Sequence, residues 1–392
     1  MASSFAEQAT EAIASKIPQL TALSHDLHAN PELCFAEHHA ADEITQLLES
    51  EGFAVQRGVG ELPTAFDAVY GSGSLHVAAI AEYDALPDVG HACGHNIIAA
   101  AGLGTGFGLQ RVADDLDLTV HVIGTPAEEG GGGKILMLNR GVFDGIHAAL
   151  MMHPWSFDRL NSSCLAVDHF DVTFTGRTAH ASAAPAQGIN ASDAMTIAQV
   201  GIGLLRQQLH PGDQVHGIVT LGGEAANIIP AKVTGRFMCR SLTLDGLSAL
   251  RPRVDHCFEA GALATGCELS LEDITPVYSH MEQDSDLLAL YRRHAEERGR
   301  SFDADDRGDP QPTYSTDMSN ISLVIPSIHP LVGIETHGAV NHQPEFAAAC
   351  LGPSANKAVL DGSIALSLTA IDAAQDHDIR QRLLATNVRR AS

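Results

Sequence analysis

Three features that classify many proteins are missing from this sequence. Its seven cysteines form no CxxC pair, and a chain of 392 residues does not need disulfides to hold a small core together. It contains no run of about 18 apolar residues, and its N-terminus lacks a basic segment followed by an apolar one. We therefore expect no disulfide scaffold, no membrane span and no export signal, and we predict a cytoplasmic protein.

Basic side chains are also scarce. Only 23 Lys and Arg stand against 48 Asp and Glu, which gives a formal net charge of −25. This surplus of negative charge opposes association with nucleic acids and with anionic membranes, so we exclude both as partners. A small anionic substrate is not excluded, because a bound cation and a few local donors dominate the field inside a cleft.

The order of the expected elements predicts an α/β protein with an inserted domain. Helical apolar spacing over 5–29 and 37–50 precedes strands at 75–83, 118–125 and 147–153, each followed by a loop. From about residue 170 to 280 the pattern becomes βαββαβ, which is ferredoxin-like, and a helix and a strand at 320–326 follow. We expect a mixed-sheet α/β domain made of 1–169 and 283–392, with a second domain at 170–282 inserted into it.

The segment GHACGH at 90–95 follows the first of these strands. Cys93 and His95 lie two residues apart around Gly94, and a thiolate beside an imidazole is typical of a metal site. His91 is a competing ligand. The alternative is a buried cysteine next to an ordinary loop histidine.

The segment AEEGGGGK at 127–134 follows the second strand. Its adjacent acids, Glu128 and Glu129, allow one carboxylate to bind a metal while the other handles protons. The alternative is a pair of acids at a helix entry. A phosphate loop is excluded, because Ile135 follows Lys134 where Ser or Thr is needed for magnesium, and the two acids would repel phosphate.

His153 closes the third strand, where the alternative is a histidine satisfied within the core. Open α/β sheets collect ligand groups beyond the carboxyl ends of their strands, so these three segments are expected to converge there. Sulfur, nitrogen and oxygen donors together suit zinc. The sequence therefore predicts a metallohydrolase.

Five ordered segments, AEYDALP, HACGHN, TPAEEGGGGK, FTGRTAHAS and EAANIIP, resemble motifs of the di-zinc aminoacylase and exopeptidase family. The resemblance is to its amidohydrolase subgroup, which acts on N-acyl amino acids, indole-acetyl amino acids and aminobenzoyl-glutamate. It implies two divalent ions per subunit, Zn²⁺ with Mn²⁺ as the alternative, bound by Cys93, His95, Glu129, His153 and His342. His337 is the local rival of His342.

The same resemblance implies that Glu128 is the general base and that Asp84 orients a ligand histidine. Where many relatives carry His-x-Asp, this chain has Glu82-Tyr83-Asp84. The segment STDMSN at 315–320 also resembles a site-lining segment, but no role follows for its side chains.

In the family the inserted domain is a lid that forms a homodimer. The resemblance implies that His180 reaches the active site of the neighbouring subunit and polarises the scissile carbonyl, and that Asn227 and Arg240 hold the free carboxylate of the substrate. The alternatives are an exposed loop histidine and an ordinary charge at a strand end.

We therefore expect hydrolysis of an N-acyl amino acid, glutamine conjugates among them, to a carboxylic acid and an amino acid. Water activated by the cation would lose a proton to Glu128, which would pass that proton to the leaving amine. The alternatives are a dipeptidase or carboxypeptidase, a metal-dependent binding protein without catalysis, and a cysteine hydrolase with Cys93 as nucleophile.

Overall fold

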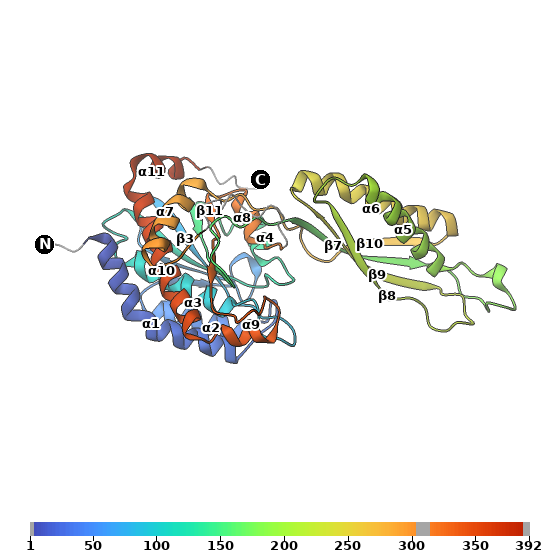
Figure 1. Cartoon of the computed structure of the whole chain (residues 1–392), viewed down its shortest axis with the longest axis horizontal. Helices are drawn as coiled ribbons and strands as arrows, with labels where there is room; N and C mark the ends of the chain where they lie inside the picture. Colours follow the sequence, from blue (N-terminus) through green and yellow to red (C-terminus); the bar gives the residue numbers. More distant parts are fainter. Residues whose placement is uncertain (1–3, 303–313, 387–392) are drawn as a thin grey trace. The chain divides into compact units, whose positions relative to one another are not determined.

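The computed structural model describes residues 4–302 and 314–386, which fold as two compact units (Figure 1). The first unit contains the described residues up to Ser163 together with two later stretches, 281–302 and 316–386. The second contains Cys164–His280 with Tyr314 and Ser315. The roles expected for the two parts, catalytic domain and lid, remain predictions.

A mixed six-stranded sheet forms the centre of the first unit. Its strand order is β1-β2-β4-β3-β5-β11, and β2 runs antiparallel to the other five strands of the sheet. The strands are β1 (Ala54–Arg57), β2 (Phe66–Tyr70), β3 (Leu75–Glu82), β4 (Leu118–Thr125), β5 (Ala148–Leu150) and β11 (Ser327–Ile328). The α/β class with a mixed sheet, predicted from the sequence, is confirmed.

Helices cover this sheet, and β3 and β4 are buried along almost their whole length because both faces of the sheet are covered. The helices of the first unit are α1 (Phe5–Ala29), α2 (His38–Ser50), α3 (His95–Gln110), α4 (Gly133–Asn139), α7 (Ser285–Glu297), α8 (Met318–Ser322), α9 (Pro344–Ala349), α10 (Pro353–Gln375) and α11 (His377–Leu384). Helix α3 lies between the sheet and helices α1 and α10 (Figure 1). A Cβ at Gly102 would lie 2.7 Å from the carbonyl oxygen of Ile80, so only glycine lets α3 pack this close.

The structure corrects the expected third strand. Residues 147–153 were expected to form one strand ending at His153, but β5 already ends at Leu150. His153 instead begins β6 (His153–Trp155), which pairs in parallel with β12 (Leu331–Gly333) as a separate two-stranded sheet. The imidazole is therefore held by a second, smaller ladder beyond the end of the main sheet.

The strand expected at 320–326 is also wrong. Helix α8 (Met318–Ser322) ends inside this segment, turn residues follow it, and the strand is limited to Ser327–Ile328. Met318, Ile321 and Ile325 follow helical spacing and are buried in one apolar cluster. The Ser322 hydroxyl donates to the Ser319 carbonyl, which stabilises the turn locally.

The second unit has the element order β7, α5, β8, β9, α6, β10, and its antiparallel sheet has the order β10-β7-β9-β8. The elements are β7 (Ala166–Thr175), α5 (Ala191–Leu205), β8 (Gln214–Leu221), β9 (Lys232–Ser241), α6 (Leu244–Thr265) and β10 (Glu268–Asp273). Its core contains Phe170, Phe237 and Phe258, whose rings contact one another. Across both units, no helix in the described chain is long and apolar enough to cross a membrane.

Candidate metal centre

The structure brings the five predicted ligands together around the Cys93 sulfur. One group of donors is Cys93, His95 and His153, and another is Cys93, Glu129 and His342. In each group the donor atoms lie within 4.8 Å of one another. The sulfur lies 3.7 Å from Nε2 of both His153 and His342, so the two groups share it.

His95 begins α3, directly after Gly94, whose φ of 81° is left-handed. The Nδ1 of His95 lies 2.8 Å from the Asp84 carbonyl oxygen and 3.1 Å from its Oδ1, so Nδ1 carries the proton and donates. The structure thus places Asp84 where it can orient this histidine. Burial would lower the pKa of His95, but the carboxylates of Glu82 and Asp84 outweigh it and raise that pKa well above its usual value.

Glu128 and Glu129 follow β4 and face the same donors. A carboxylate oxygen of each lies within 4 Å of His95 Nε2, at 3.9 Å for Glu128 and 3.8 Å for Glu129. Burial, together with the charges of Glu82 and Glu129, raises the pKa of Glu128 well above its usual value. A carboxyl group with a raised pKa can accept and return a proton near neutral pH, as a general base must.

Three charged residues that sequence reasoning did not connect form a buried network beside these donors. The Lys134 ammonium has no exposed surface and lies between the carboxylates of Glu82 and Asp317, 2.8 Å from Oδ1 of Asp317. The other oxygen of Glu82 lies 3.0 Å from His95 Nε2. Glu82 thus links the network to the donors. Asp317 belongs to the segment 315–320, whose side chains had no predicted role, and its contact with Lys134 gives that segment a place beside the site.

His329 is a second omission, because a lone histidine in the segment IHP carries no motif. Its side chain is fully buried, and its ring centroid lies 5.6 Å from that of His153. Neither ring nitrogen has a hydrogen-bond partner within the described ranges, and burial lowers its pKa to about 3. A neutral imidazole therefore lies beside the donor histidine His153.

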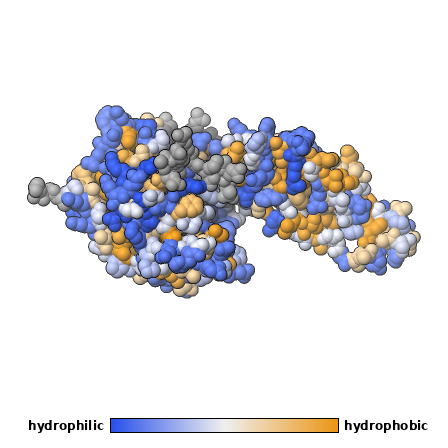
Figure 2. Space-filling view, viewed as in Figure 1, coloured by the Kyte–Doolittle hydropathy of each residue, from blue (hydrophilic) through white to orange (hydrophobic). Residues whose placement is uncertain are grey.

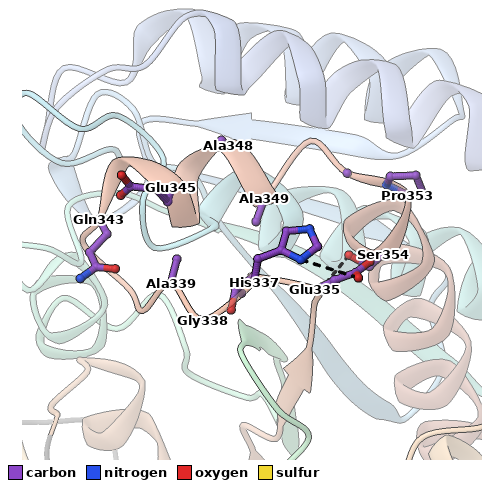
Figure 3. A pocket seen from close by; sticks show the side chains of 12 residues that line it. Glu335, His337, Gly338, Ala339, Gln343, Glu345, Ala348, Ala349, Pro353 and Ser354 are labelled. Atoms are coloured by element: carbon purple, nitrogen blue, oxygen red, sulfur yellow. Dashed lines mark hydrogen bonds and ion pairs between the residues drawn. The ribbon is translucent and has the colours of Figure 1, made fainter.

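The two rivals for ligand roles lie elsewhere in the first unit. His337 is 82% exposed and lies 3.8 Å from Glu335 in a hollow of about 620 Å³ beside α9 and the start of α10 (Figure 3). His91 is buried and stacks on His28 with ring centroids 6.1 Å apart. The structure brings His342 to the cluster. Neither rival belongs to the two donor groups that share Cys93, or to the third group among the described residues, which is Glu82, His95 and Glu128.

The donor set fits divalent cations. Thiolate sulfur, imidazole nitrogen and carboxylate oxygen together suit zinc. Among the described residues, the buried atom Glu129 Oε1 has no hydrogen-bond partner, and His95 Nε2 faces Glu82 Oε1 at 3.0 Å although neither atom makes a hydrogen bond. Buried polar atoms seldom stay unpaired, so a bound cation explains them.

The substrate residues expected from the resemblance lie in the second unit. His180 is exposed, and its backbone pairs beside Asn227, whose carbonyl accepts the Ala181 N–H at 2.9 Å. Arg240 lies at the other end of β9, where Nη1 donates to Ser315 Oγ at 3.1 Å. Since a strand rises about 3.3 Å per residue, the part of β9 from Lys232 to Arg240 alone spans about 26 Å. One copy of this unit does not bring Asn227 and Arg240 together.

Comparison with known proteins places the chain in a family. The model of Peptidase family M20/M25/M40 matches residues 66–357. The chain belongs to this family. It is similar to the Xaa-Arg dipeptidases of Mus musculus, 36% identical over 93% of this chain and 88% of that protein, and of Homo sapiens, 33% identical over the same shares. The predicted family and a hydrolase activity of that family are confirmed.

Solved structures agree on the fold. A putative aminohydrolase from methicillin-resistant Staphylococcus aureus superposes with a TM-score of 0.76 at 22% identity, covering 93% of this chain and 99% of that one. A dinuclear metal-binding peptidase of family M20 from Bacillus subtilis gives 0.69 at 21% identity, covering 92% and 99%. At these identities the likeness establishes the fold alone.

Proposed function

We propose that this protein is a metal-dependent amidohydrolase that releases an amino acid from an amide-linked acyl or aminoacyl group. The proposal rests on residues that the fold brings together. Two donor groups share the Cys93 sulfur, and the carboxyl group of Glu128, whose pKa is raised, lies beside them. Cys93, His95, Glu129, His153 and His342 would hold two divalent cations, with zinc favoured by the donor types. When bound, the cations would acidify water and polarise the scissile carbonyl.

Glu128 moves the proton in this proposal. Its carboxylate takes a proton from the attacking water and then delivers it to the amide nitrogen, which leaves as an amine. Burial and neighbouring carboxylates keep this group ready to hold a proton between the two steps. Burial also raises the pKa of Cys93 well above its usual value, which disfavours a free thiolate nucleophile and so the cysteine-hydrolase alternative.

His180 is proposed to stabilise the developing oxyanion. The backbone N–H groups of Ser182 and Ala183 point to its Nδ1, at 3.3 and 3.1 Å, so Nδ1 accepts and Nε2 carries the proton. That tautomer presents an N–H donor on the exposed side of the ring. Loss of one such donor costs about a hundredfold in rate in acyl transfer.

A homodimer through the second unit is part of the proposal. Strand β8 is an edge strand of its sheet, and apolar side chains are exposed on β8 and on α5: Ile197, Val200, Leu204, Ile218, Val219 and Leu221. Apolar surface gathers over this unit in Figure 2. A second copy would cover it, and the distance between Asn227 and Arg240 supports a carboxylate site built from two copies.

Two substrate classes share the bond to be cleaved. The first is an N-acyl amino acid, as expected from the sequence. The second is a dipeptide with a C-terminal basic residue, favoured by the relatives named Xaa-Arg dipeptidase and by the net charge of −25, which attracts cationic substrates. In both, the Arg240 guanidinium is proposed to bind the free carboxylate.

Matched substrates separate these classes. We expect hydrolysis of at least one substrate in the set acetyl-Arg, Ala-Arg, acetyl-Gln and Ala-Gln, loss of activity with a chelator, and recovery with zinc or manganese. Glu128→Gln should lower kcat by at least about a hundredfold while bound metal is unchanged. Glu335→Gln, an exposed glutamate away from the donors, is the control. Near-normal turnover by Glu128→Gln disproves the assignment, and no hydrolysis of any substrate favours a binding protein.

A further inference from the structure

The sequence of the loop that carries Glu128 and Glu129 does not by itself restrict its backbone to one conformation. Four consecutive glycines, at 130–133, follow the two glutamates. Glycine loses more conformational freedom on ordering than any other residue, so contacts from outside the loop must hold it in one conformation. The direction in which Glu128 points therefore depends on those contacts.

Three buried carboxylates from outside the loop supply them. The backbone N–H of Ala127 donates to Glu37 Oε1 at 2.9 Å, and that of Glu129 donates to Asp84 Oδ2 at 3.0 Å. The N–H of Lys134 donates to Asp317 Oδ2 at 2.9 Å. The first two bonds hold the residues immediately before and after Glu128.

The side chain of Glu37 does not cap the helix that follows it. The residue precedes α2 at the N-cap, yet its side chain makes no hydrogen bond to that helix. The carboxylate is fully buried: Oε1 accepts the N–H groups of Phe35 and Ala127, each at 2.9 Å, and Oε2 accepts the Thr64 hydroxyl at 2.9 Å. A buried carboxylate turned away from its own helix needs another explanation.

Ala127 shows what this carboxylate holds in place. Its φ of 60° lies in the left-handed region, which residues with a Cβ seldom adopt. Its carbonyl accepts the Gly131 N–H at 3.0 Å, so the loop turns back on itself directly after Glu128. Such a conformation persists only where surrounding bonds determine it.

We propose that Glu37 is a positioning residue for the catalytic base: by fixing Ala127 in the left-handed conformation, it aims Glu128 at the reacting water. This inference rests on the proposed function. It goes beyond that function by making turnover depend on a residue that lies 90 positions away from Ala127 in the chain and outside the donor groups.

The test compares Glu37→Met with Glu37→Gln. The methionine has no oxygen for the Ala127 N–H, so kcat should fall by at least about tenfold, because a small misplacement of a reacting group is costly. The glutamine keeps one oxygen acceptor and should restore kcat to within about threefold of the wild type. The KM and the bound metal should change by less than about twofold in both variants, because ground-state binding is untouched.

Glu32→Met is the matched control. Glu32 lies on the same segment and accepts the N–H groups of His39 and Ala40 at 3.0 Å each, but it has no bond to the loop of Glu128. This variant should lose stability and keep kcat. If Glu37→Met does not fold, Thr64→Val removes the donor to Oε2 and should lower kcat by about two- to fivefold.

Several outcomes would overturn the proposal. Among them are a normal kcat in folded Glu37→Met, or in Thr64→Val if that is the variant available. Equal losses of kcat in Glu37→Met and Glu32→Met would indicate general damage, and loss of metal in parallel with kcat would indicate an effect on Glu129. Glu128→Gln, assayed beside them, separates these failures, because its full activity would contradict the proposed function itself.

Discussion

Replacing Lys134 with methionine should strongly destabilise the first unit. Its ammonium is fully buried between Glu82 and Asp317, so the variant leaves two carboxylates in the interior without their cation. Removing one partner of a buried ion pair costs about 3–5 kcal/mol, because the remaining charge is neither solvated nor paired. We expect a loss of this size in the free energy of unfolding of metal-depleted protein at pH 8.

The loss should shrink in acid. Burial raises the pKa of Asp317 to about 6 from a usual value of 3.8, and loss of the Lys134 charge would raise it further. A carboxyl group whose folded pKa is raised favours folding below its unfolded pKa, and that contribution is lost as the pH rises through the folded value. At pH 5 Asp317 is protonated in the variant, so less uncompensated charge remains buried.

Urea unfolding followed by circular dichroism measures the difference. Lys357→Met is the control, because Lys357 also pairs with a buried aspartate, Asp361, but is 55% exposed and should cost no more than about 1 kcal/mol. The combination of Lys134→Met with Glu82→Gln and Asp317→Asn should recover most of the loss, since it buries no charge. A loss below about 1 kcal/mol in Lys134→Met, or one equal at pH 5 and pH 8, would refute the reasoning.

Three further predictions concern the metal, the pH and the core. Because the two donor groups of the proposed metal sites share Cys93, Cys93→Ala should lower bound zinc at both, whereas His342→Ala should lower it at one; equal losses in metal analysis would contradict this sharing. Burial raises the pKa of Glu37 to about 7 from 4.5. The unfolded chain therefore ionises at this position more readily than the folded protein, and the wild type loses stability as the pH rises from 4.5 through 7. Glu37→Gln should be more stable than the wild type at pH 8, by up to about 3 kcal/mol, and equally stable at pH 4. A larger difference in the free energy of unfolding at pH 4 than at pH 8 would contradict the direction of this pKa shift. Phe258→Ala should destabilise the second unit by about 3–5 kcal/mol in urea unfolding, because its ring packs on Phe237 at a centroid distance of 4.9 Å, and a loss below about 1 kcal/mol would mean that this core repacks freely.

Local patterns were sufficient for much of the site. Cys93 and His95 follow one buried strand and Glu128 and Glu129 follow its parallel neighbour, so the carboxyl ends of β3 and β4 bring both pairs to one edge of the sheet. Apolar periodicity and turn residues encode such elements within a few residues. His153 shows the limit, because an apolar run does not reveal that β5 ends at Leu150 and a new ladder begins.

The charged partners could not be read from the chain in the same way. Lys134 and Asp317 are 183 positions apart, and Glu37 and Ala127 are 90 apart, with no periodicity that links either pair. The short apolar run at 320–326 is compatible with a strand and with a helix. The packing of Met318 and Ile321 in the core favours the helix α8 at its start.

The amino-acid sequence by itself determined the α/β class, the order of strands and loops, the acidic surface charge and the residue types of a metal site. Only the tertiary structure decided which carboxylates are buried, which cation neutralises them and which of them hold the loop of Glu128. The physical reason is range: backbone propensity and hydrophobic spacing act over a few residues, whereas desolvation and ion pairing depend on segments that meet only when the chain is folded.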